Sequence, residues 1–73
     1  MATIQIKAEV SGSVWKIITA VGEAIEPGGT LMIIESMKME IPVAAPAAGK
    51  VKSILVAVDD VVAEGQALAI IET

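Results

Sequence analysis

The sequence lacks cysteine, histidine and arginine, and its single aromatic residue is Trp15. Without cysteine there is no disulfide framework, and without cysteine and histidine there is no zinc finger. The same absences exclude a Cys or Ser–His nucleophile pair and an imidazole base. Without arginine there is no bidentate clamp for phosphate. The chain is therefore not expected to be an enzyme, and neither a catalytic residue nor a metal site is predicted.

Positive charge and long apolar runs are also scarce. Five lysines stand against nine acidic residues, a net charge of -4, which argues against binding to nucleic acid or to an anionic membrane. The mean hydropathy is high, at +0.76, but a membrane span needs about 18 consecutive apolar residues. Runs such as residues 54–58 are far shorter, and Pro42 and Pro46 interrupt residues 41–49. The N-terminus shows no secretion signal, so a cytoplasmic location is expected.

An internal repeat organises the chain. A shift of 37 positions superposes residues 2–36 on residues 39–73 without a gap, and 12 of the 35 pairs are identical. A chain of this composition would give about three or four identical pairs by chance. The residues left over are Met1, Met37 and Lys38, so the seam between the halves is Met37–Lys38. Residues 1–73 are interpreted as one small domain made of these two half-repeats.

Each half has the pattern of β structure. Apolar residues alternate with polar ones over residues 4–8, and apolar, mostly β-branched runs of strand length follow at 14–21 and 31–35. The second half repeats this pattern, and Pro27-Gly28 suits a type II turn. The prediction is an all-β fold, a flattened barrel or sandwich of two four-stranded antiparallel sheets with pseudo-two-fold symmetry. With the two-fold axis across the long direction of the barrel, that symmetry places Lys38 at one end and the two termini at the other.

The seam carries the tripeptide Met37-Lys38-Met39, at the hairpin that would join the two halves. Together with the segment PAAGKV at residues 46–51 and the stretch 65–68, it resembles the biotinyl/lipoyl attachment domains. The similarity covers nearly the whole chain and is greatest to the biotin carboxyl carrier branch, in particular its stand-alone attachment proteins. The gapless match of the halves leaves no room for the thumb insertion of some acetyl-CoA carboxylase carriers.

The resemblance implies that Lys38 receives biotin through an amide bond made by a biotin protein ligase, with Met37 and Met39 as flanking recognition residues. It further implies a carrier of carboxyl groups between the biotin carboxylase and carboxyltransferase of a biotin-dependent carboxylase, such as an acyl-CoA carboxylase. The carrier is expected to be monomeric on its own. Because the chain offers no histidine or cysteine that could act as a base, Lys38 is interpreted as a substrate position rather than a catalytic residue.

Two alternatives remain open from the sequence. A lipoyl carrier of a 2-oxo acid dehydrogenase or of the glycine-cleavage system would share the fold and the lysine, but its turn typically reads Asp-Lys-Ala, so Met37 and Met39 argue against it. An unmodified β-barrel adaptor would bind a partner through the face that carries Trp15.

The residues next to the tripeptide also have plainer interpretations. Met37 and Met39 could simply cap the end of the barrel as adaptable filler. Glu35 and Glu40 are interpreted as solvated flanks, and paired-carboxylate catalysis is not expected of them. Ser36 departs from the alanine that is most common before Met-Lys-Met in biotin carriers.

Overall fold

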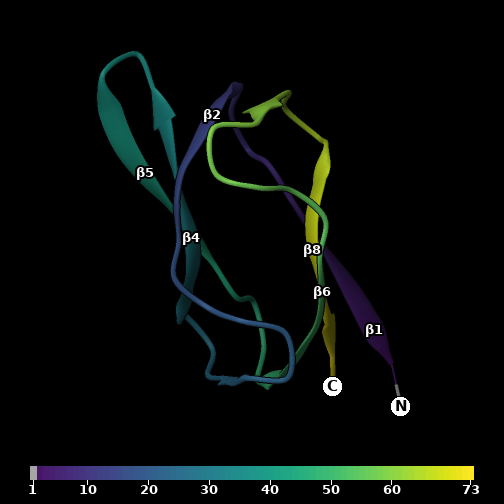
Figure 1. Cartoon of the computed structure of the whole chain (residues 1–73). Coiled ribbons are helices and arrows are strands. Elements are labelled where there is room, and N and C mark those ends of the chain that lie inside the picture. Colours follow the sequence, from purple (N-terminus) through teal and green to yellow (C-terminus); the bar gives the residue numbers. More distant parts are fainter. Residues whose placement is uncertain (1) are drawn as a thin grey trace.

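The computed structural model describes residues 2–73, and within that range it contains strands and no helix (Figure 1). No segment of this range is therefore a helix long and apolar enough to cross a membrane. The strands are β1 (Thr3–Lys7), β2 (Gly12–Ile17), β3 (Ala24–Ile25), β4 (Thr30–Ser36), β5 (Met39–Ala44), β6 (Gly49–Ile54), β7 (Val61–Val62) and β8 (Ala67–Glu72).

The strands form two four-stranded sheets, ordered β1-β8-β6-β3 and β5-β4-β2-β7, in which all the pairings are antiparallel. A shift of 37 residues carries β1, β2, β3 and β4 onto β5, β6, β7 and β8, and it carries one sheet onto the other. The predicted fold class is confirmed. The halves are interleaved, however, because each sheet takes strands from both, and the repeat alone did not predict this.

Backbone hydrogen bonds tie the two halves together in matched pairs. The Gly28 N–H donates to the Ala45 carbonyl at 2.8 Å, and the Ala45 N–H donates to the Gly29 carbonyl at 2.8 Å. The equivalent pair, at 2.7 and 2.8 Å, joins Ala8 to the turn at residues 65–66. Gly28 has φ +81°, the left-handed value that the second central position of the expected type II turn requires. These bonds extend the β4–β5 and β1–β8 pairings beyond the ends of the strands, and each of these pairings joins one half-repeat to the other.

The core lies between the two sheets and is apolar. The side chains that are almost fully buried come from both sheets: Val14, Leu31, Met32, Ile34, Val51, Val62, Leu68 and Ile71. Among residues 2–73 no polar or charged side chain is buried. Trp15 is 45% exposed on the outside of β2, and its repeat partner Lys52 is exposed on β6. Burial of the apolar side chains stabilises the fold through the hydrophobic effect.

The strands β2 and β6 end at Ile17 and Ile54, four residues earlier than the β-branched runs suggested. The chain turns there, because the Glu23 carboxylate accepts the Ala20 N–H at 3.3 Å while the Ala20 carbonyl accepts the Glu23 N–H at 3.1 Å. The loop at 57–60 repeats this closure with an aspartate. Acidic side chains that bond nearby backbone compete with a strand ladder, and here they end it.

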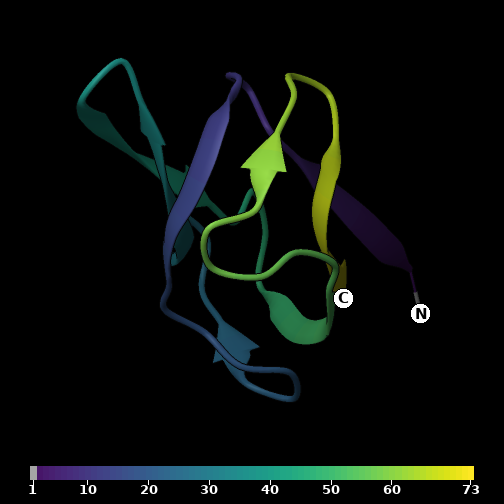
Figure 2. The same ribbon diagram turned by 45° about the horizontal axis from the view of Figure 1, so that its top comes forward.

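The molecule is elongated, with extents of 36 × 17 × 17 Å. The Thr73 N–H donates to the Ala2 carbonyl at 2.9 Å, so the described chain ends lie together. The β4–β5 hairpin protrudes at the opposite end, as both views show (Figures 1 and 2). The predicted separation of hairpin and termini is thus found for residues 2–73, whereas Met1 lies outside the described residues.

Candidate cofactor-attachment site

The protruding hairpin closes with a two-residue turn. The β4–β5 register pairs Glu35 with Glu40 and Ser36 with Met39, which leaves Met37 and Lys38 as the turn residues. Their φ angles are +52° and +64°, both in the left-handed region. Two consecutive left-handed residues are the signature of a type I′ turn, whose twist matches that of the flanking strands.

This turn is strained by its sequence. Type I′ turns usually take Asn-Gly or a similar pair, because a side chain with a Cβ is disfavoured by about 1–2 kcal/mol per residue in the left-handed region. The ladder from Thr30–Ala44 to Ser36–Met39 holds the strained conformation in place. Such strain often marks functional positions. The pattern of apolar residues did not predict this strain. The sequence feature that could have predicted it is a two-residue turn that contains neither glycine nor asparagine.

The side chains of the turn face solvent. Met37 is 92% exposed and Met39 is 65% exposed, and Lys38 is exposed as well. None of the side-chain hydrogen bonds found among residues 2–73 involves Lys38. The structure thus brings the three predicted site residues together at one tip, with the amine free to meet another protein.

The acidic flanks face solvent too. Glu35 and Glu40 sit directly opposite each other on the ladder, and both are exposed. Like charges in this position destabilise a sheet slightly, and full hydration keeps that effect small. Their exposure fits the expectation of solvated flanks.

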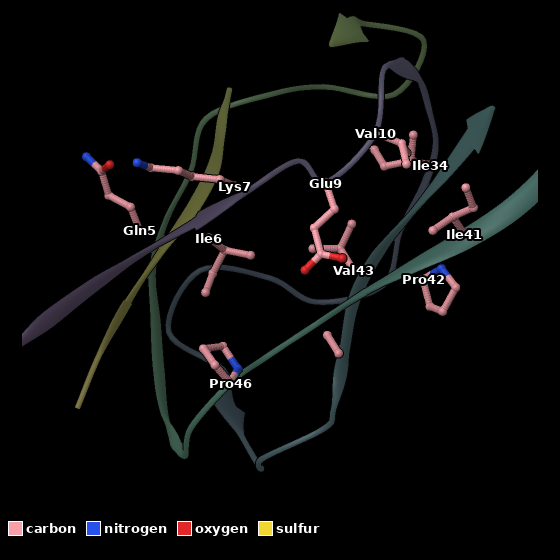
Figure 3. A pocket seen from close by; sticks show the side chains of 11 residues that line it. Gln5, Ile6, Lys7, Glu9, Val10, Ile34, Ile41, Pro42, Val43 and Pro46 are labelled. Atoms are coloured by element: carbon pink, nitrogen blue, oxygen red, sulfur yellow. The ribbon is translucent and has the colours of Figure 1, made fainter. Parts of the chain in front are cut away.

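A cavity of about 250 Å³ lies elsewhere, between the edge strands β1 and β5 (Figure 3). Ile6 and Glu9 point into it from one wall, and Val43 and Pro46 line the other. Its lining includes none of Met37, Lys38 and Met39. The hairpin is therefore a presented site and not an enclosed one, which fits covalent attachment of a group to an accessible amine.

Residues 2–71 match the model of a protein family described as biotin-requiring enzymes, the biotin/lipoyl attachment family. The chain belongs to this family. Its resemblance to biotinyl/lipoyl attachment domains is thereby confirmed, and biotin is the cofactor named for the family.

Known proteins similar to this biotinyl-type domain agree with the assignment. A protein of Mycolicibacterium smegmatis named biotinylated protein TB7.3 homolog is 48% identical over 40 residues, 55% of this chain and 56% of that protein. The crystal structure of Kluyveromyces lactis urea carboxylase matches with a TM-score of 0.94 and 38% identity, over 99% of this chain and 6% of that one. The aligned part thus spans little more than half of one relative and a small piece of the other.

A lipoyl domain is similar as well. The solution structure of the lipoyl domain of the Azotobacter vinelandii 2-oxoglutarate dehydrogenase complex has a TM-score of 0.74 and 26% identity, covering 88% of this chain and 81% of that one. The two-sheet architecture is therefore common to both kinds of carrier, and the fold does not by itself choose between them.

Proposed function

We propose that Lys38 is the residue to which biotin is attached, and that the domain carries carboxyl groups between the active sites of a biotin-dependent carboxylase. The observation that carries the proposal is an exposed lysine at the tip of a strained two-residue turn, at the seam of a duplicated scaffold. The similarity to a biotinylated protein and to urea carboxylase supports it.

Attachment requires one reaction of this chain. The lone pair of the Lys38 Nζ attacks the acyl carbon of biotinyl adenylate, the C–N bond of an amide forms, AMP leaves, and the ammonium proton passes to a base. No histidine or cysteine is present in the chain, and both neighbouring glutamates are solvated. The base must therefore come from the biotin protein ligase, which makes Lys38 a substrate residue.

Once attached, biotin supplies a ureido nitrogen that accepts and releases a carboxyl group. The domain's part is to hold the tether at one end of a body 36 Å long, away from its own chain ends. Tethering raises the effective concentration of the carrier at each partner site. Biotin carboxylase and carboxyltransferase are the proposed partners, and they supply the catalytic groups that this chain lacks.

Incubation of the apoprotein with a biotin protein ligase, biotin and ATP tests the proposal. Intact-mass measurement is expected to show one added biotinyl group, and peptide mapping is expected to place it on Lys38. Absence of the adduct, or an adduct on another lysine, would contradict the proposal. The lipoyl domain similarity makes a lipoyl carrier the second candidate, so a parallel reaction with a lipoate ligase is needed. Modification in that reaction alone would select the second candidate.

Replacement of Met37 by asparagine separates the shape of the turn from recognition of its side chain. Asparagine tolerates the left-handed region, so the free energy of unfolding is expected to stay the same or to rise slightly. Burial of a methionine side chain against a partner is worth about 1.5–3 kcal/mol, so kcat/KM for biotinylation is expected to fall about tenfold or more. Thermal unfolding and ligase kinetics measure the two effects. An unchanged kcat/KM would show that Met37 is only filler.

A further inference from the structure

One contact links the protruding hairpin to the body of the domain beyond the sheet ladder. The Ser36 hydroxyl donates a hydrogen bond of 2.7 Å to the Ser11 backbone carbonyl, across 25 residues of sequence. This is the usual length of a good O–H···O hydrogen bond. Ser36 is the last residue of β4 and directly precedes the Met37–Lys38 turn.

This bond lies at the point where the β4–β5 hairpin loses its support from β2. Pairing between β2 and β4 stops at Ser13–Glu35, so the sheet no longer supports Ser36 on that side. Further out, the register holds Ser36 to Met39 alone, within the hairpin itself. The hydroxyl of Ser36 therefore adds one more lateral tie, at the point where the hairpin leaves the sheet.

Backbone packing at the same corner sets the geometry of the tie. A Cβ placed on Gly12 would lie 2.3 Å from the Glu35 carbonyl oxygen, so the backbone segments at Gly12 and Glu35 are in close contact. The adjoining residues, Ser11 and Ser36, are thereby brought within bonding reach. The Ser11 hydroxyl in turn accepts the Glu64 N–H at 3.3 Å, which anchors the receiving corner to the turn before β8.

The tie does not follow from the duplication. The repeat partners of Ser36 and Ser11 are Thr73 and Ala48, and Thr73 instead donates its hydroxyl to the Ala2 carbonyl at 3.3 Å. By contrast, the close approach at Gly12 is repeated at Gly49. The scaffold is thus duplicated at this corner, whereas the Ser36–Ser11 bond belongs to the attachment end alone among residues 2–73.

We infer that Ser36 is a positioning residue, which fixes the direction in which the hairpin presents Lys38 to the ligase. This inference rests on the proposed biotinylation. Without the bond the hairpin would sample more orientations, and the fraction of molecules that the ligase can bind would fall. Because apparent affinity falls in proportion to the competent fraction, KM is expected to rise while kcat is retained. The loss of one neutral hydrogen bond corresponds to a rise in KM of about three- to tenfold.

Steady-state biotinylation of Ser36→Ala, Ser36→Thr and Ser13→Ala tests this inference. Threonine keeps the hydroxyl, and Ser13 lies beside the same corner on β2 without any side-chain hydrogen bond in the described chain. We expect a raised KM and an unchanged kcat for Ser36→Ala, wild-type values for Ser13→Ala, and recovery in Ser36→Thr. An unchanged KM in Ser36→Ala, or an equal rise in Ser36→Thr, would overturn the inference.

Amide hydrogen exchange across the Ser36–Met39 pair gives a readout that needs no ligase. Faster exchange in Ser36→Ala than in Ser13→Ala is expected, with protection restored in Ser36→Thr. If the wild-type protein accepts no biotin, the proposed function fails, and the exchange comparison alone then decides whether Ser36 holds the hairpin. Equal exchange in Ser36→Ala and Ser13→Ala would overturn the positioning role.

Discussion

Lys38→Arg is expected to abolish biotinylation completely. The guanidinium group remains protonated throughout the accessible pH range and offers no free lone pair for attack on an acyl adenylate. The substitution keeps the positive charge and nearly the same length. Since Lys38 makes no side-chain hydrogen bond among residues 2–73, the melting temperature should not change. Intact mass and streptavidin binding after co-expression with a ligase measure the loss.

Lys50→Arg and Lys52→Arg are matched controls, because both lysines are exposed on β6, away from the hairpin. Labelling of these variants should equal that of the wild type. If Lys38→Arg still acquired the label, biotin would be attached to another lysine. The proposal that the β4–β5 hairpin carries the biotin would then be wrong. An unmodified β-barrel adaptor, the alternative that the sequence also left open, predicts full function in Lys38→Arg.

The repeat accounts for how much of the fold could be predicted. Residues that match at a spacing of 37 occupy equivalent strands, so the duplicated strand pattern and a hairpin at residues 37–38 followed from one alignment of the chain with itself. The pattern of apolar residues did not locate the two short strands β3 and β7. The exchange of strands between sheets did not follow. Alternation of apolar residues fixes which face of a strand is buried, and it carries no information about which neighbour the strand pairs with.

Local competition explains the remaining errors. The runs at 14–21 and 51–58 look like single strands because their residues are β-branched, but the carboxylates of Glu23 and Asp60 bond to nearby backbone and end the strands early. At the site, the exposed Met-Lys-Met tip was predictable from its place at the seam. The Ser36–Ser11 bond was not, because a serine that bonds to a backbone carbonyl 25 residues away leaves no pattern in one sequence.

Gly49→Ala is expected to produce one of the two largest losses of stability, together with Gly12→Ala. A Cβ at Gly49 would lie 2.5 Å from the Glu72 carbonyl oxygen, and the backbone of β8, which is paired on both sides, cannot move aside as a flexible side chain can. Overpacking of this kind lowers the free energy of unfolding by about 1–3 kcal/mol. In a domain of this size each kcal/mol corresponds to about 4–8 °C in melting temperature. Thermal and urea unfolding followed by circular dichroism give both quantities.

Gly65→Ala is the control for backbone strain without crowding. Gly65 has φ +85° and no heavy atom within 4 Å of its added Cβ. Its loss should be about 1 kcal/mol, from the left-handed conformation alone. A larger loss in the free energy of unfolding for Gly65→Ala than for Gly49→Ala would contradict this prediction. The close approach of β6 to β8 would then not explain why residue 49 is a glycine.

Gly12→Ala separates an effect on the stability of the fold from an effect on the attachment site. Gly12 is the repeat partner of Gly49, so the two substitutions can be compared directly. An added Cβ at Gly12 would meet the Glu35 carbonyl at 2.3 Å, so its effect on stability should match that of Gly49→Ala. Glu35, however, directly precedes Ser36, and Gly12 follows Ser11, so separation of these chains also breaks the tie at the base of the hairpin. At temperatures where both variants remain folded, we therefore expect Gly12→Ala to raise KM for biotinylation and Gly49→Ala to leave it unchanged.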